Sequence, residues 1–227
     1  KLNFEKLMIK LPNFEKAFEY ENNFYLSCDI TRISKILSHY EIYKMIKEVP
    51  GEIIECGVFK GASYLRFSMF REIFGNPYSK KIIGFDTFEK FPETSNHEDK
   101  KARTQFIDSA GSDSISKEQL LKILEYKKLN RHLDLIEGDI TQTVPAYVKA
   151  NPELKISLLN LDTDIYEPAV TILENLYPKI TKGGILMLDD YGTHPGETKA
   201  VDEFFQDKNI EIKKFSFAMT PCYIIKP

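Results

Sequence analysis

The hydrophobic positions of the chain follow two alternating periods. In residues 32–49 apolar side chains recur every three or four positions, which predicts an amphipathic helix that Pro50 and Gly51 end. Beyond it, short apolar runs typical of buried strands alternate with helical segments. The predicted strands are 52–59, 80–88, 132–139, 155–162 and 183–190, and the predicted helices are 62–75, 116–129, 143–151, 166–180 and 196–208.

This alternation predicts a parallel sheet covered by helices on both faces. Two β-rich segments close the chain at 210–218 and 222–227, and the short link between them suits an antiparallel hairpin. The predicted fold class is therefore α/β, a Rossmann-like seven-stranded sheet that is mostly parallel with an antiparallel edge strand. We expect a helical N-terminal extension at 1–50 and one α/β domain at 51–227.

The stretch 89–113 is polar and has no apolar period, and it is long for a connection inside a compact domain. Connections of this kind often act as lids or binding loops. We therefore expect a lid-like insertion at about 89–115.

Composition excludes several classes of protein. The chain has 227 residues, of which 42% are hydrophobic, enough for one core. A net charge of -3 without a basic face argues against nucleic acid as a partner, and no apolar run reaches the ~18 residues of a membrane span. Three cysteines far apart, Cys28, Cys56 and Cys222, form neither a disulfide framework nor a zinc motif, which favours a cytoplasmic protein. The first residue, Lys1, leaves the true N-terminus open.

Acidic residues stand where five consecutive predicted strands end. They are Glu55, Asp86, Asp139, Asp162 with Asp164, and Asp189 with Asp190. Strands are generally poor in aspartate, and open α/β sheets bind ligands outside the carboxyl ends of their strands. The pattern therefore predicts a ligand site along this edge.

The first three strand ends are typical of a nucleoside site. In "ECGVFKGAS", Glu55 and Cys56 precede Gly57 and Gly61, which permit a tight turn and a close approach of backbone to a ligand. The spacing is not the G-x-G-x-x-G of dinucleotide sites. Asp86, with Thr87, is placed to bind ribose hydroxyls, and Asp139, with Ile140, an adenine amino group. A plain turn at the glycines and helix caps at the acids are the alternatives.

The motifs together resemble a known family. The order of features resembles class I S-adenosylmethionine-dependent methyltransferases, and the combination below resembles the macrocin O-methyltransferase (TylF) family, over about residues 24–210. The matching segments are "ECGVFKGAS", "GFDTFEKFP", "GDITQTVP", "LDTDIYEP", "LYPKITKGGILMLDDYG" and "KAVDEFF". The resemblance implies S-adenosylmethionine as cofactor, a sugar hydroxyl as acceptor and a possible homo-oligomer. The sugar's carrier, whether nucleotide, glycan or natural product, is left open.

Clustered carboxylates at the last two strand ends raise the question of a cation. Asp162, Asp189 and Asp190 would repel one another, and a divalent ion removes that cost. Oxygen ligands suit Mg²⁺, Mn²⁺ or Ca²⁺, and the absence of His and Cys from these motifs argues against zinc. The resemblance implies Mg²⁺ at these three positions and Asp164 as the general base. The alternatives are a solvated turn at 189–190 and a helix cap at Asp164, three residues before Glu167.

Several further residues carry weaker predictions. Ser63 is expected either to contact the amino-acid part of the cofactor or to cap its helix. Thr31 and Arg32 match a family segment that folds over the cofactor, although helix capping explains them equally well. His97 and His194 fall in predicted loops and receive no catalytic role.

Three other functions compete with a sugar methyltransferase. A methyltransferase acting on a catechol-like diol would use the same metal chemistry. A nicotinamide-dependent oxidoreductase lacks its glycine motif here. A non-catalytic nucleotide- or metal-binding module would bind cofactor without transfer.

Overall fold

The computed structural model describes residues 9–227, and within them a seven-stranded sheet runs through the centre of the molecule in the order β3-β2-β1-β4-β5-β7-β6. The strands are β1 (Glu52–Cys56), β2 (Ile82–Asp86), β3 (Leu133–Glu137), β4 (Ile156–Leu161), β5 (Ile180–Leu188), β6 (Lys213–Lys214) and β7 (Cys222–Ile225). The first five pair in parallel, β7 runs antiparallel to β5, and β6 pairs antiparallel with β7. The predicted fold class is confirmed.

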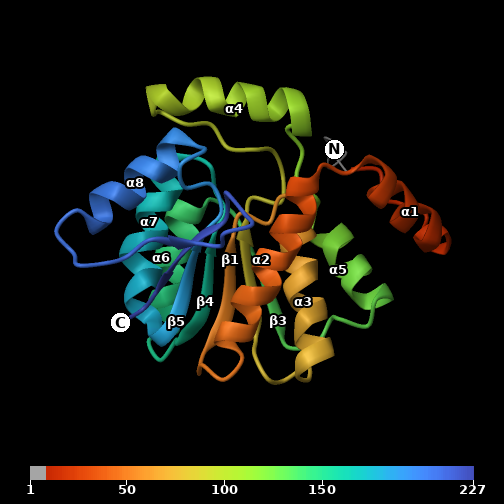
Figure 1. The fold of residues 1–227 in the computed structure, drawn as a ribbon, viewed down its shortest axis with the longest axis horizontal. Coiled ribbons are helices and arrows are strands. Elements are labelled where there is room, and N and C mark those ends of the chain that lie inside the picture. Colours follow the sequence, from red (N-terminus) through yellow and green to blue (C-terminus); the bar gives the residue numbers. More distant parts are fainter. Residues whose placement is uncertain (1–8) are drawn as a thin grey trace, which may run out of the picture.

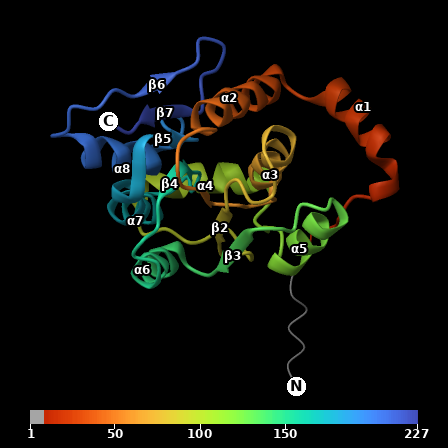
Figure 2. The same cartoon turned by 90° about the horizontal axis from the view of Figure 1, so that it is seen from below.

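Helices cover both faces of the sheet (Figures 1 and 2). One face carries α2 (Ile30–Ile46), α3 (Ala62–Phe74) and α5 (Lys117–Tyr126), and the other carries α6 (Ile140–Ala150), α7 (Tyr166–Leu176) and α8 (Pro195–Phe205). Successive strand residues alternate between the two cores, as Ile53 and Ile54 do in β1. Among residues 9–227, the helices lack the combination of length and apolar character that a membrane crossing requires.

Local capping explains where the observed helices depart from the predicted ranges. Ser116 caps α5 with a full capping box, as its side chain and that of Gln119 exchange bonds with the backbone. Helix α6 begins at Ile140, three residues earlier than predicted, because Asp139 caps it. Helix α7 gives way at its end to a short 3₁₀ turn, η2 (Tyr177–Lys179), that contains a proline.

The N-terminal extension contains two helices and a turn rather than one helix. A 3₁₀ turn, η1 (Phe14–Lys16), leads into α1 (Ala17–Ser27), and α2 follows. Helix α2 packs against the sheet through Ile42, Tyr43 and Ile46, whereas the described side chains of α1 are all at least partly exposed. Positions 1–8 of the predicted extension lie outside the described residues.

The polar stretch predicted as a loop contains a helix, α4 (His97–Ala110), which lies across the end of the molecule above the sheet (Figure 1). The loop prediction was wrong there because α4 has no apolar face that would reveal its period. Asn96 caps it by accepting a hydrogen bond from the Glu98 backbone.

Polar contacts dock α4 onto the body of the protein. Asp99 is 1% exposed, and its Oδ2 accepts a hydrogen bond from the Tyr166 backbone at 2.9 Å. Tyr166 is the first residue of α7, so Asp99 supplies the cap that this helix lacks locally. The carboxylate also lies against Gly196 in the first turn of α8, where an added Cβ would come within 2.3 Å of its oxygens.

Glu167 holds the segment that leads into α4. Its carboxylate accepts hydrogen bonds from the Thr94 hydroxyl at 3.0 Å and from the backbone of Ser95 and Asn96 at 2.9 and 3.2 Å. Helix α4 also makes an aromatic contact with the body, because the ring of Phe106 packs against that of Phe59 with 5.3 Å between their centroids.

The Asp99 contact predicts a variant with a loosened α4. Replacing Asp99 with Ala should remove about 1 kcal/mol of capping energy, which corresponds to roughly fivefold more frequent opening of residues 89–115. Limited proteolysis and amide hydrogen exchange of this segment measure the effect. The neighbouring exposed Glu98→Ala variant is the control, and equal protection in both variants would contradict the docking role of Asp99.

Candidate functional site

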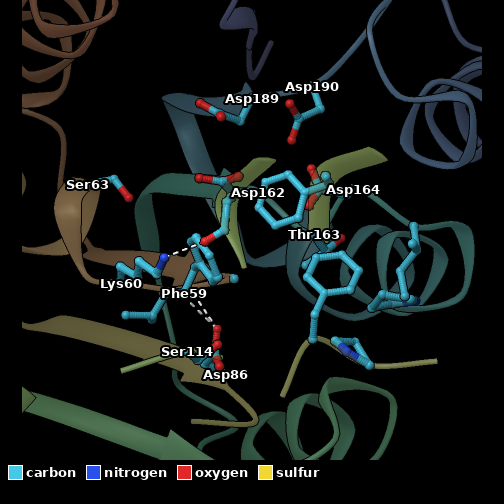
Figure 3. A pocket seen from close by; sticks show the side chains of 18 of the residues that line it. Phe59, Lys60, Ser63, Asp86, Ser114, Asp162, Thr163, Asp164, Asp189 and Asp190 are labelled. Carbon is cyan, nitrogen blue, oxygen red and sulfur yellow. Dashed lines mark hydrogen bonds between the residues drawn. The ribbon is translucent and has the colours of Figure 1, made fainter. Parts of the chain in front are cut away.

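A cavity of about 940 Å³ lies at the carboxyl ends of the parallel strands, partly beneath α4 (Figure 3). Its lining includes Phe24 of α1 and Arg32 and Lys35 of α2. Asp162, Asp164, Asp189 and Asp190 gather at one end, Asp86 lies towards the other, and Ser63 lies at one side. The cavity therefore has an acidic end and a second end formed by the loops that follow β1, β2 and β3.

The end of β1 contributes its loop to the cavity and its strand residues to the interior. Among the described residues, the lining includes Gly57 and Ser63 but not Glu55, Cys56 or Gly61. Cys56 is fully buried in the core. The cofactor contacts predicted for Glu55, Cys56 and Gly61, which do not line the cavity, stay predictions.

Glu55 and Ser63 form a buried pair. The Ser63 hydroxyl donates to Glu55 Oε1 at 2.7 Å. Burial raises the pKa of Glu55 to about 8, although this hydrogen bond acts in the opposite direction. The capping alternative for Ser63 was wrong, since Gly61 occupies the N-cap of α3.

The backbone at position 57 can accommodate only a glycine. Its φ is +95°, and a Cβ there would lie 1.6 Å from the Asp162 carbonyl oxygen. This close approach brings the end of β1 against the end of β4, where the acidic cluster begins.

Asp86 organises the loop that follows β1. Its Oδ2 accepts hydrogen bonds from the backbone of Val58 at 2.8 Å and Phe59 at 2.9 Å, and its Oδ1 accepts one from Phe88 at 2.7 Å. Burial raises the pKa of Asp86, while these three bonds hold it down. Asp86 and Thr87 both line the cavity, so the predicted ribose contact stays open to them.

Asp139 caps α6 and also lines the cavity. Its Oδ1 accepts hydrogen bonds from the backbone and the hydroxyl of Thr141, both at 2.8 Å. Ile140, the next residue, lines the cavity as well. Capping and the predicted adenine contact are compatible, because the cap occupies one of two carboxylate oxygens.

Thr31, the predicted cofactor contact in the N-terminal extension, lies in the first turn of α2. Asp29 caps α2 by accepting a hydrogen bond from the Thr31 backbone at 2.9 Å. Thr31 is exposed and is not among the described residues that line the cavity, whereas Arg32 is. Asp29 rather than Thr31 is the cap, so the capping alternative is wrong for Thr31, and its predicted cofactor contact stays a prediction.

Strand register brings three carboxylates together. Leu161 of β4 pairs with Leu188 of β5, so Asp162 and Asp189 follow at neighbouring positions. Oxygen atoms of Asp162, Asp189 and Asp190 lie within 4.8 Å of one another. The predicted convergence of these three residues is confirmed in position, and the solvated-turn alternative fails for Asp189, which is 3% exposed.

The cluster is electrostatically unbalanced. Burial, followed by the charge of Asp189, raises the pKa of Asp162 well above its ordinary value. Burial would also raise the pKa of Asp189, but the adjacent Lys35 and His39 reverse the effect and lower it. Asp189 Oδ1 and Asp190 Oδ2 are buried, and among the described residues neither has a hydrogen-bond partner. Such oxygens are available to a cation.

Asp164 stands beside this cluster in a left-handed conformation with φ of 61°. Helix α7 begins two residues later, with Ile165 at its N-cap and no side-chain cap. The capping alternative for Asp164 was therefore wrong, and Glu167 turns to the α4 segment instead. Burial, followed by the charge of Asp190, raises the pKa of Asp164 well above its ordinary value.

His194 also lies at the acidic end of the cavity, although the sequence assigns it no role. Its Nδ1 lies 3.1 Å from Asp190 Oδ1, and its Nε2 lies 3.6 Å from Asp164 Oδ1. The Asp190 carboxylate raises the pKa of His194, against the effect of burial. In the sequence, its position four residues after Asp190 and directly before a helix was the signal that could have placed it beside the aspartates.

Two residues of α2 also reach the cluster and were not predicted. Lys35 Nζ lies 2.5 Å from Asp189 Oδ2, and His39 Nε2 lies 3.9 Å from Asp189 Oδ1. Burial lowers the pKa of His39 to about 4. The two are four residues apart and share a helix face, so a polar stripe on the predicted amphipathic helix was the signal.

Two curated relatives match part of the chain. The 8-demethyl-8-(2,3-dimethoxy-alpha-L-rhamnosyl)-tetracenomycin-C 4'-O-methyltransferase of Streptomyces olivaceus is 29% identical over 63% of this chain and 54% of its own length. Demethyldecarbamoylnovobiocin O-methyltransferase of Streptomyces niveus is 27% identical over 69% of this chain and 58% of its own length. The chain thus spans a little over half the length of these relatives.

Solved structures extend the similarity. The calicheamicin methyltransferase CalS11 is 28% identical, with a TM-score of 0.76 over 92% of this chain and 84% of its own. Another CalS11 structure, described as a TDP-rhamnose 3'-O-methyltransferase, is 27% identical, with a TM-score of 0.67 over 94% of this chain and 87% of its own.

The family comparison covers most of the site. The family model described as macrocin O-methyltransferase (TylF) matches residues 32–223. This range contains the four clustered aspartates, the loop after β1 and the residues of α2 that meet them. The chain therefore belongs to the macrocin O-methyltransferase (TylF) family.

Proposed function

We propose that the protein is an S-adenosylmethionine-dependent O-methyltransferase that methylates a hydroxyl of a sugar with the help of a divalent ion. The observation that carries this proposal is the convergence of Asp162, Asp189 and Asp190 at one end of a cavity whose other end suits a nucleoside. Family membership and relatives named for sugar-bearing products support the same class of reaction.

The second end of the cavity suits the cofactor. Asp86 and Asp139 place carboxylates at the ends of neighbouring strands, and Gly57 keeps the loop after β1 close to β4. S-adenosylmethionine, when bound, supplies a methyl group on a positively charged sulfur. Acidic residues nearby favour that charge.

The acidic end suits a hard divalent ion. Its donors are carboxylate oxygens, and two of them are buried without a hydrogen-bond partner among the described residues. Asp162, Asp189 and Asp190 would hold Mg²⁺, and Mn²⁺ or Ca²⁺ suit the same ligands. When bound, the ion would orient adjacent sugar hydroxyls and lower the pKa of one of them.

Asp164 is placed to accept the proton of the acceptor hydroxyl. Its carboxylate lines the cavity beside the cluster, and its φ of 61° fixes the backbone that presents it. His194, at 3.6 Å, would orient this carboxylate and hold Asp190. Alignment of hydroxyl and methyl is then the main contribution of the protein.

The N-terminal helices and the segment that leads into α4 also bound the cavity. They contribute Phe24, Arg32 and Phe91 to its lining. An aromatic ring and a guanidinium suit a sugar that carries a further polar or charged group, such as a nucleotide sugar. A catechol-like diol would use the same metal ligands and stays the second candidate.

Replacing one of the proposed metal ligands should separate cofactor binding from methyl transfer. Asp162→Asn should lower Mg²⁺-dependent methyl transfer at least about 100-fold, since it removes a negative ligand at the reacting end. Stabilisation by S-adenosylhomocysteine should change little. Transfer from labelled S-adenosylmethionine to TDP-rhamnose and a panel of glycosides, together with thermal melting, measures both.

The matched control is Asp207→Asn, an exposed aspartate after α8. Full activity in Asp162→Asn would remove the metal assignment. Stabilisation by NAD with none by S-adenosyl compounds would favour an oxidoreductase, and cofactor binding without transfer to any acceptor would favour a binding module.

The raised pKa values predict how stability depends on pH. Burial raises the pKa of Asp162, Asp164 and Glu197 above their ordinary values of 3.8, 3.8 and 4.5. At these three groups the folded state then binds more protons than the unfolded state, so their contribution to metal-free stability should fall as pH rises above about 5. His39 contributes the opposite change up to about pH 6.5, because burial lowers its pKa from 6.5 to about 4. Saturating Mg²⁺ should flatten this decline. Melting temperatures in EDTA and in Mg²⁺ test it, and identical slopes would contradict it.

A further inference from the structure

Lys35 places a positive charge inside the carboxylate cluster from a distant part of the chain. It lies on α2, 154 positions before Asp189, and its Nζ is 2.5 Å from Asp189 Oδ2. Its ammonium group also experiences the charges of Asp162 and Asp190. All three carboxylates of the candidate metal site therefore act on one lysine.

The two oxygens of Asp189 have different surroundings. Oδ1 is buried and lies 3.9 Å from Nε2 of His39, whose Nδ1 is in turn 3.0 Å from Arg66 Nη1. Oδ2 is the oxygen that holds Lys35. A divalent ion held by Asp162, Asp189 and Asp190 would therefore bind a carboxylate that already holds the ammonium group through Oδ2.

Two cations cannot share this place. Mg²⁺ binds carboxylate oxygens at about 2.0–2.1 Å, and an ammonium group held at the same carboxylate would lie within a few ångströms of the ion. Repulsion between these charges is strong in a partly buried site. The Lys35 side chain is 27% exposed and lines the cavity, and its four-carbon stem allows the ammonium group to move into that space.

We propose that Lys35 is an internal counter-ion that neutralises the carboxylate cluster until a divalent ion displaces it. The inference rests on the proposed metal site and adds a competitor that belongs to the chain. Lys35 stabilises the metal-free protein, weakens metal binding, and makes the position of a side chain on α2 depend on the metal.

Replacing Lys35 with Met keeps the length of the side chain and removes its charge. We expect Mn²⁺ to bind Lys35→Met at least about tenfold more tightly than the wild type, since a positive charge beside the ion is lost. In EDTA this variant should melt several degrees lower than the wild type, and saturating Mn²⁺ should close the gap. Calorimetry and the electron paramagnetic resonance of free Mn²⁺ measure the affinity without cofactor or acceptor.

The matched control is Lys44→Met on the same helix, whose lysine pairs with Glu41 at 2.9 Å and is half exposed. It should alter neither the affinity for Mn²⁺ nor the gap in melting temperature. Equal Mn²⁺ affinity in the wild type and in Lys35→Met would overturn the inference and leave the metal site standing. No Mn²⁺ binding to either protein would overturn the metal site together with it.

Displacement of the Lys35 ammonium group by the metal ion can also be measured by the chemical reactivity of the lysine. Acetylation of lysines followed by mass spectrometry should show Lys35 protected in EDTA and several-fold more reactive in Mg²⁺, with the reactivity of Lys44 unchanged. A lysine that merely stays beside the ion would keep the same protection in both conditions, which would overturn the exchange.

Discussion

Repulsion among carboxylates at the ends of β4 and β5 is the constraint on which the rest of the site depends. The pairing of Leu161 with Leu188 forces Asp162 and Asp189 together, and Asp190, Asp164 and the buried Glu197 follow within the same region. Burial makes each charge costlier and each repulsion stronger. Lys35 and His194 face these carboxylates and provide part of the balance, and His39 lies beside Asp189. A divalent ion would provide the remainder, which connects the stability of the fold to its proposed chemistry.

The segments around the cavity are attached largely by polar contacts, in contrast to the apolar cores on the two faces of the sheet. Helix α4 is held by Asp99 and Glu167, which bind backbone groups, and by the packing of Phe106 against Phe59. Helix α2 is anchored by Ile42, Tyr43 and Ile46 at one end and meets the carboxylates through Lys35 at the other. This division gives a rigid floor that positions the aspartates and more easily moved walls that admit cofactor and acceptor.

Periodicity and strand ends were sufficient to predict the sheet and the convergence of Asp162, Asp189 and Asp190, because parallel strands deliver consecutive loops to one edge. They were insufficient where contacts are distant in sequence. Helix α4 has no apolar stripe, and Lys35, His39 and His194 acquire their significance from neighbours that only the folded chain brings near. Gly57 likewise meets a constraint that only the fold reveals, since an added Cβ would lie 1.6 Å from the Asp162 carbonyl oxygen.

The central claim, that these carboxylates form a divalent-metal site, is tested most directly by anomalous diffraction from crystals grown with Mn²⁺ and S-adenosylhomocysteine. We predict a single strong peak within about 2.5 Å of oxygens from Asp162, Asp189 and Asp190. A cluster without a peak, with Lys35 still against Asp189 at saturating Mn²⁺, would contradict the account.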